Sequence, residues 1–302
     1  MSETCSRSWT PQRPLDLCAV LAPLRRGRGD PTMRVDDEGT VWRAGTTPTG
    51  AATLALRRER SGTVHATGWG SGAAWALDGL PALLGADDDD SAFVSHHPLI
   101  AQVRHRMPGL RLGATRRVWD VLMPAVLEQK VTGVEARRSW RELCWRFGEQ
   151  APGPVELWVP PGPAAVRVIP DWEWHRAGVD RFRRRALLAA ATVAHRLEGA
   201  VALAGQAGRD LLCQVPGIGI WTAAEVAQRA WADADAVSVG DYHIPSVVGY
   251  ALVGRPLDDA GMLEVLAPYA PQRHRAVRYV EASGFRRPRF GPRLPFRDDR
   301  VR

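Results

Sequence analysis

The spacing of hydrophobic and polar positions changes near residue 92. Before it, apolar and polar residues alternate in short stretches, and this alternation predicts strands. The alternating stretches are residues 33–35, 40–43, 52–57 and 63–67. Each consecutive pair flanks a polar turn, so two hairpins are expected. A short helix is expected to follow over residues 75–84.

After residue 92 the apolar positions recur at helical spacing. The pattern is clearest at Trp140, Leu143, Cys144 and Phe147, within a helical stretch predicted over residues 118–147. Pro124 is expected to mark a kink or a first-turn position. Residues 181–197 predict another helix, basic on one side, and residues 152–163 a Pro- and Gly-rich loop.

These patterns predict a mainly α fold with an N-terminal α+β domain. Residues 1–92 would form a small antiparallel sheet plus a helix, and residues 93–285 would be all-helical. Residues 286–302 form an Arg-rich C-terminal tail. The acidic run at residues 87–90 is interpreted as a solvated linker at the domain boundary.

Composition excludes several classes of protein. The 302 residues suggest about two domains, and 45% hydrophobic with 24% charged residues is ordinary for a globular chain. A largely disordered, collagen-like or coiled-coil chain is therefore not expected. No stretch is apolar enough to span a membrane, and the first eleven residues lack a signal-like apolar segment. We expect a cytoplasmic, nucleoid-associated protein without a membrane partner.

The cysteines and histidines give no metal-binding pattern. Cys5, Cys18, Cys144 and Cys213 are far apart in the chain, so neither a zinc site nor an iron–sulfur cluster is expected, and no cofactor is required. We interpret the cysteines as free buried thiols in a reducing compartment. The pair His96-His97 and the lone His243 are assigned solvated or capping roles.

Positive charge is concentrated at the C-terminus. The net charge is +7, and residues 271–302 carry ten arginines against three carboxylates, which accounts for all of it. A second cluster comprises Arg181, Arg183, Arg184 and Arg185. Localised charge of this kind fits a polyanion partner or a solvated tail, and both interpretations stay open.

The most informative segment spans residues 211–250. Helical spacing ends near Leu212 and resumes at Trp221, with Pro216, Gly217, Ile218 and Gly219 between them. This predicts a helix-hairpin-helix at about residues 207–231. Free N–H groups at the start of the second helix would suit a phosphate. Many helix pairs share such a turn, so the turn alone is weak support.

An aspartate follows at a suggestive distance. Asp241 lies 20 residues after Trp221, directly before a helix expected over residues 242–252. The N–H groups and dipole of a helix start favour a carboxylate. Taken alone, Asp241 would be interpreted as a helix cap.

The combined pattern resembles the helix-hairpin-helix DNA glycosylase superfamily. The matching residues are Leu212, Val215, Pro216, Gly217, Ile218, Gly219, Thr222, Ala223 and Asp241. Within it, the chain resembles the 3-methyladenine DNA glycosylase II family at residues 108–112, 125–129 and 240–242. The resemblance covers about residues 105–285 by motif and the N-terminal domain only by architecture.

The resemblance implies a monofunctional DNA glycosylase of base excision repair. It would bind duplex DNA containing damaged bases, flip out an alkylated purine such as 3-methyladenine and hydrolyse its bond to the sugar. Asp241 would be catalytic, and Trp221, Tyr242 and Glu225 would form the base pocket. DNA would be held by Pro216, Gly217, Ile218, Gly219, Thr222, Gln129 and Lys130. Strand-cutting relatives carry a lysine where Trp221 stands.

Two positions depart from the family pattern. Lys130 stands where relatives often have an apolar wedge residue, and Glu225 where they can carry an aromatic pocket residue. A carboxylate at Glu225 would shift base preference toward groups that donate hydrogen bonds, or would face solvent. The resemblance also implies a monovalent cation at the hairpin, and we expect a monomer. The alternatives are a non-catalytic DNA- or lesion-binding protein and a glycosylase for another base, such as uracil, hypoxanthine or a mismatch.

Overall fold

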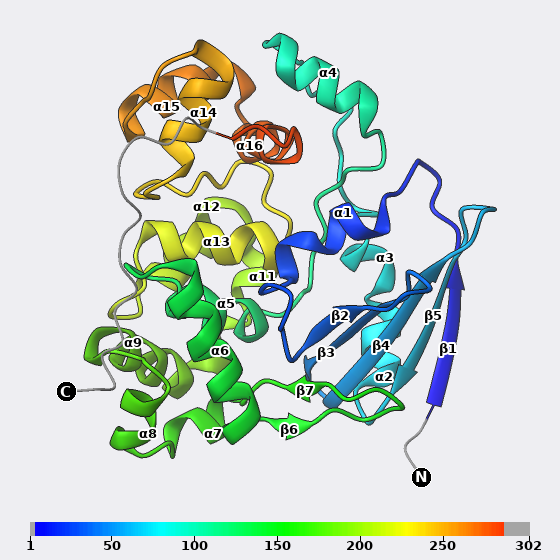
Figure 1. Cartoon of the computed structure of the whole chain (residues 1–302), viewed down its shortest axis with the longest axis vertical. Helices are drawn as coiled ribbons and strands as arrows, with labels where there is room; N and C mark the ends of the chain where they lie inside the picture. The colour runs from blue at the N-terminus through cyan, green and yellow to red at the C-terminus, as the bar shows by residue number, and fades with distance from the viewer. Residues whose placement is uncertain (1–3, 287–302) are drawn as a thin grey trace.

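The computed structural model describes residues 4–286 and places a five-stranded sheet beside a larger helical part (Figure 1). The strands are β1 (Thr4–Trp9), β2 (Met33–Val35), β3 (Val41–Thr47), β4 (Gly50–Arg58) and β5 (Val64–Trp69). The sheet is antiparallel, in the order β1-β5-β4-β3-β2. The mainly α fold with an N-terminal α+β domain is thus confirmed.

Both predicted hairpins are present, as β2 with β3 and β4 with β5. Along β5 the residues Val64 and Ala66 are buried while His65 between them is exposed, because one sheet face is covered. The covering helices are α1 (Leu17–Leu21), α2 (Ala73–Asp78) and α3 (Leu80–Leu83). The helix expected over residues 75–84 is therefore two helices that meet at Gly79.

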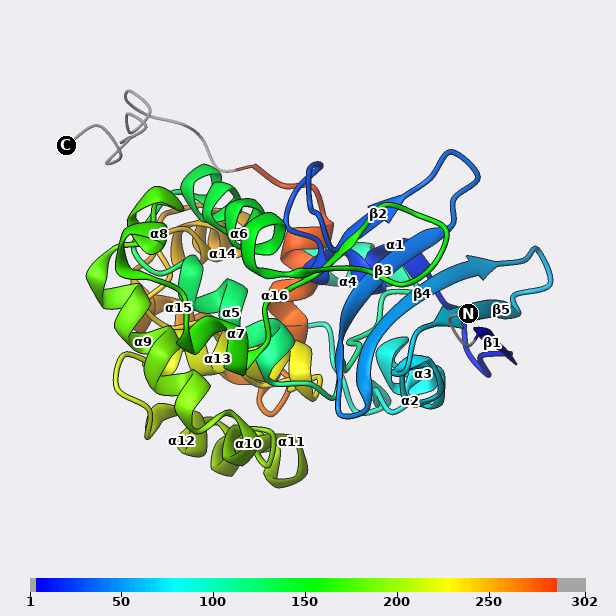
Figure 2. The ribbon, with the colours of Figure 1, turned by 90° about the horizontal axis from the view of Figure 1, so that it is seen from below.

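The helical part contains two cores. The larger core joins α5 (Trp119–Leu127), α6 (Gly133–Phe147), α7 (Pro163–Arg167), α8 (Asp171–Arg176), α9 (Arg181–Thr192), α10 (Ala194–Leu197), α11 (Ala200–Leu203), α12 (Gly205–Cys213) and α13 (Ile220–Ala230). The smaller core joins α4 (Pro98–Arg106), α14 (Ile244–Val253), α15 (Asp259–Leu266), the turn η2 (Ala267–Tyr269) and α16 (Arg273–Ala282). Figure 2 shows the sheet with α2 and α3 on one side of the molecule and the helical part on the other.

Two predicted helices are interrupted. Residues 118–147 form α5 and α6 with a loop over residues 128–132, because Thr132 and Glu135 start α6 with a reciprocal capping box. Lys130 in this loop has a φ of +54°. Pro124 lies inside α5 and not in its first turn. The stretch 181–197 breaks at Val193, between α9 and α10.

The interpretation of the acidic run as a solvated linker is wrong for Asp88. Its side chain is buried and pairs with Arg275 of α16, whose Nη1 donates to Oδ2 over 2.8 Å. The backbone N–H of Leu112 donates to the same oxygen. A buried carboxylate needs such partners, so Asp88 joins α16 to the chain that precedes α4.

Smaller structural features complete the fold. A short two-stranded ribbon, β6 (Glu149–Gln150) with β7 (Trp158–Val159), and the turn η1 (Ala22–Leu24) border the helices.

No single helix within residues 4–286 is long and apolar enough to cross a membrane. Helix α9 and residues 194–203 reach that length and apolar character only when they are taken together, and the pair is bent by 79°. Of the four free cysteines Cys144 is buried, whereas Cys18 is exposed, so the expectation of buried thiols holds only in part. Apart from Arg286, the Arg-rich tail lies outside the described residues.

Candidate active site

The predicted hairpin is formed by α12 and α13. Its tip is exposed at Gly217 and Gly219, while Ile218 between them is buried in the core. Gly217 has a φ of +89°, and a Cβ there would lie 2.7 Å from the Cβ of Ala186 on α9. Within residues 4–286 the backbone N–H groups of Gly217, Gly219 and Ile220 have no hydrogen-bond partner. The tip therefore presents donors at a helix start, which is an arrangement that binds anions.

The α5–α6 loop is tied to this hairpin through Gln129. The side-chain amide of Gln129 donates to the carbonyl of Gly217 over 3.0 Å and to the hydroxyl of Thr222 over 2.8 Å. Thr222 itself is buried. Both residues were expected to contact DNA; the structure gives them a bridging role inside the protein, and leaves Lys130, the next residue, exposed at the loop tip.

Asp241 is held at the start of α14 by three N–H donors. Its Oδ1 accepts from the backbone of His243 over 2.7 Å and of Ile244 over 2.8 Å, as a helix cap does. Its Oδ2 accepts from the indole N–H of Trp221 over 3.0 Å. An ionised carboxyl group can accept about four hydrogen bonds, so one direction remains, on Oδ2. The cap and the candidate catalytic group are thus the same side chain.

Asp241 and Trp221 line a cavity of about 400 Å³. Its other walls come from four distant parts of the chain: the end of α1 and the segment after it, residues 111–113, the α5–α6 loop with the start of α6, and α16. Glu225 lines it too, one turn after Trp221 on α13. Asp241, Trp221 and Glu225, which the resemblance assigned to one site, therefore line the same cavity, whose volume is typical of small-molecule sites.

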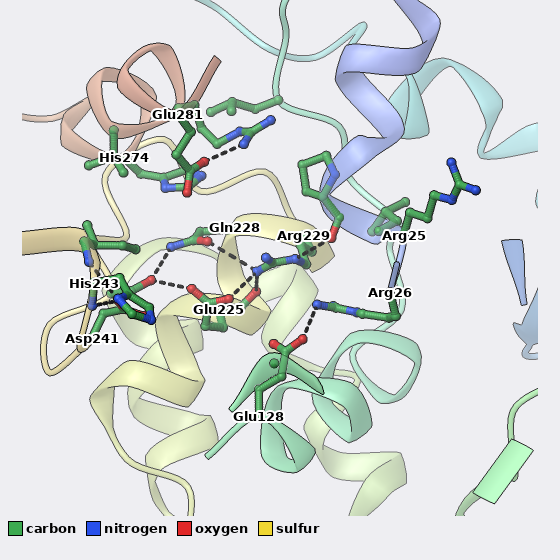
Figure 3. A pocket seen from close by; sticks show the side chains of 18 of the residues that line it. Arg25, Arg26, Glu128, Glu225, Gln228, Arg229, Asp241, His243, His274 and Glu281 are labelled. Atoms are coloured by element: carbon green, nitrogen blue, oxygen red, sulfur yellow. Dashed lines mark hydrogen bonds and ion pairs between the residues drawn. The ribbon is translucent and has the colours of Figure 1, made fainter. Parts of the chain in front are cut away.

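A buried hydrogen-bond network forms one wall of the cavity (Figure 3). The carboxylate of Glu225 accepts from the hydroxyl of Ser238 over 2.5 Å and from Nη1 of Arg229 over 2.9 Å. The side-chain amide of Gln228 donates to the same hydroxyl over 2.8 Å. Glu225 is therefore neither exposed to solvent nor unpaired.

Tyr242 is not part of the cavity wall. Its side chain is 74% exposed, and its ring meets that of His243 edge to face. Because Asp241 turns inward to cap α14, the next residue points outward. The expectation that Tyr242 forms the base pocket is not met by this geometry. His243, assigned a solvated or capping role, does line the cavity.

Sequence reasoning missed several cavity residues. His274 on α16 is buried and lines the cavity, and Arg26 pairs with Glu128 over 3.0 Å on another wall. Their positions depend on the packing of segments more than a hundred residues apart, and no local motif marks them. His97, in contrast, lies elsewhere and pairs with the hydroxyl of Tyr269 at 2.7 Å.

The described residues contain no group of three or more His, Cys, Asp or Glu side chains that could hold a metal ion. The residues around Asp241 therefore offer hydrogen-bonding and charge, without a ready metal ligand set.

Comparisons with known proteins place this fold. No family model and no curated protein sequence matches the chain. A 3-methyladenine DNA glycosylase from Archaeoglobus fulgidus aligns with a TM-score of 0.74 at 16% identity, over 92% of this chain and 99% of that one. An 8-oxoguanine glycosylase/lyase from Clostridium acetobutylicum aligns at 0.71 and 10% identity, over 94% and 98%.

A third solved structure, of MBOgg1 with a low-affinity DNA ligand, aligns with a TM-score of 0.69 at 14% identity, over 94% of this chain and 98% of that one. Each of the three alignments covers more than nine tenths of both chains. At these identities they establish architecture. The chain has the fold of the helix-hairpin-helix DNA glycosylases.

Proposed function

We propose that this protein is a monofunctional DNA glycosylase that hydrolyses the bond between a damaged purine and its sugar in duplex DNA. Alkylated purines, with 3-methyladenine as the type, are the class implied by the sequence resemblance. The proposal is carried by one observation: Asp241 lines a base-sized cavity and is fixed there by three N–H donors.

The hairpin supports binding to the DNA backbone. A phosphate placed against Gly219 would meet N–H groups that have no partner within residues 4–286, at the start of α13. The same helix carries Trp221, so a strand held at the hairpin is held close to the cavity. A nucleotide beside that phosphate must leave the base stack before its base can enter the cavity.

The carboxylate of Asp241 supports the hydrolytic step. The bond from C1′ to the base nitrogen breaks with its electron pair leaving on the base, and the sugar acquires oxocarbenium character. A fixed negative charge beside C1′ stabilises that state. Water then forms the new bond to C1′ and loses its proton to the carboxylate, which passes it to solvent when a cationic N-alkylpurine leaves as a neutral base, or to the base when an uncharged nucleobase leaves as an anion. The unused hydrogen-bonding direction on Oδ2 suits this transfer.

Water is the proposed nucleophile because no amine is found among the cavity residues within positions 4–286. Lyase chemistry requires a lysine amine that attacks the sugar. The chain contains one lysine, Lys130, which lies at the exposed tip of the α5–α6 loop and is not among the cavity residues. Borohydride reduction during turnover should therefore trap no covalent complex with DNA, and a complex that disappears in Lys130→Arg would contradict this point.

Incubation with alkylated duplex DNA tests the proposal. Alkali would then cleave the strand at new abasic sites, and mass spectrometry would identify the released base. Binding to lesion-containing duplexes without abasic sites in any of them, whether alkylated or carrying uracil, hypoxanthine or a mismatch, would instead support the non-catalytic alternative. Single-lesion duplexes with uracil, hypoxanthine or a mismatch separate the remaining alternatives, in which the enzyme acts on another base.

A further inference from the structure

The cavity wall around Trp221 is polar and carries a positive balance of charge. Among its described residues it contains one indole ring and no phenyl or phenol ring. Its arginines are Arg25, Arg26, Arg111, Arg137, Arg229 and Arg278, and its carboxylates are Glu128, Glu225, Asp241 and Glu281. A cationic base binds favourably between aromatic rings or beside an unpaired carboxylate. This wall offers a single indole ring and few unpaired carboxylates.

The carboxylates near α13 are already engaged. Glu225 has one oxygen occupied by Ser238 and the other by Arg229. Glu128 pairs with Arg26, and Glu281 pairs with Arg278 over 2.5 Å. A positive ring entering the cavity would have to compete with these arginines for every carboxylate except Asp241.

The buried imidazole of His274 lies in the same positive surroundings, which lower its pKa, and it can form hydrogen bonds with a ligand. Burial, together with the guanidinium groups of Arg278, Arg229 and Arg275, holds its pKa well below the usual range of histidine. The imidazole is therefore neutral at pH 7, with one donor and one acceptor. It has no hydrogen-bond partner in the described part of the chain. Charges that keep a proton off this ring also disfavour a cationic base beside it.

Arg229 supplies further donors on the adjoining wall. Its Nε donates to the carbonyl of Pro23 over 3.1 Å, and its Nη1 donates to Glu225 and Gln228. Its Nη2 donates to no atom within residues 4–286. The guanidinium is thus fixed in place while keeping N–H groups free for a ligand.

We infer that the cavity selects an uncharged damaged base, recognised by hydrogen bonds from Arg229 and His274, over cationic N-alkylpurines. Such bases present a carbonyl oxygen or a ring nitrogen as acceptor, as hypoxanthine and neutral cyclic adducts of adenine do. The inference rests on the proposed function and refines it by naming the charge and the hydrogen-bonding character of the base.

Binding of matched duplexes by the Asp241→Asn protein tests this selectivity without turnover. The duplexes differ at one nucleotide, which is hypoxanthine or 7-methylguanine. Both bases carry the same carbonyl group, and only the second is cationic. We expect hypoxanthine to bind at least tenfold more tightly. Equal affinity, or tighter binding of 7-methylguanine, would overturn the inference.

His274→Phe, added to that protein, removes the hydrogen bonds and adds an aromatic face. It should reduce the preference to less than about threefold, whereas His105→Phe, at an exposed position on α4, should leave it unchanged. If His274→Phe does not fold, Arg278→Gln serves, because it removes positive charge from the same wall. An unchanged preference in the folded variant would contradict the assigned role.

Base excision by the wild-type protein distinguishes failure of the selectivity inference from failure of the proposed glycosylase function. Release of 7-methylguanine without release of hypoxanthine or ethenoadenine would overturn the inference and leave the glycosylase proposal standing. Release of none of these bases, nor of 3-methyladenine, would overturn the proposed function itself.

Discussion

The indole N–H of Trp221 donates to Oδ2 of Asp241, joining two residues that lie 20 positions apart in the chain. The bond fixes the indole at the cavity and the carboxylate beside it. Oδ1 is independently fixed by the start of α14. The indole of Trp221 thus holds the carboxylate that we propose to be catalytic.

Trp221→Phe should slow base release with little loss of DNA affinity. A hydrogen bond to a charged group contributes about 1.5–3 kcal/mol, which corresponds to a roughly 10- to 100-fold fall in single-turnover rate. Trp172→Phe, at an exposed position on α8, is the matched control. A Trp221→Phe rate equal to that of the wild type would show that the bond does not position the carboxylate.

The two glycines of the hairpin should respond differently to alanine. In Gly217→Ala, an alanine would have to adopt a φ of +89°, and its Cβ would lie 2.7 Å from the Cβ of Ala186. We therefore expect a loss of roughly 1–3 kcal/mol in the free energy of unfolding. Gly219 has a φ of −97° and open space at its Cβ. Gly219→Ala should leave the melting temperature unchanged but weaken DNA binding. Equal DNA affinity in that variant would place the DNA backbone elsewhere.

Gln129→Met keeps the length of the side chain but removes both N–H donors to the hairpin. Because the α5–α6 loop would no longer be tied to Gly217 and Thr222, DNA affinity should fall about tenfold, which is the scale of two ordinary hydrogen bonds. Fluorescence anisotropy with a duplex containing an abasic analogue measures this. Gln102→Met, at an exposed position on α4, is the control. If both variants bind equally well, the bridge has no part in binding.

The stability of the protein should fall between pH 7 and pH 5.5 partly through His274. Its pKa in the folded state lies well below that in the unfolded chain, because of burial and nearby arginines. As the pH falls, the unfolded chain binds the proton first, so unfolding becomes more favourable by about 1 kcal/mol over this interval. His274→Gln should flatten the dependence by that amount in urea titrations. An identical slope in both proteins would mean that His274 is accessible to protons in the folded state.

The parts predicted correctly from the sequence were local in the chain. The hairpin follows from a glycine turn between two helical patterns, and the resemblance assigned Asp241 and Trp221 to one site without indicating the hydrogen bond between them. Strand β1 was missed because its partner β5 lies about 60 residues away and its own side chains are at best half-buried. Asp88 was misjudged because its partner, Arg275, is 187 residues distant. His274 was missed for the same reason.

Asp241→Asn tests the central claim most directly. Asparagine keeps the shape and a cap oxygen but removes the negative charge that would stabilise the sugar. We predict that single-turnover release of a damaged base from duplex DNA falls by at least 1,000-fold, about 4 kcal/mol, while the affinity for the same duplex changes by less than about threefold. Release at the wild-type rate would contradict the account.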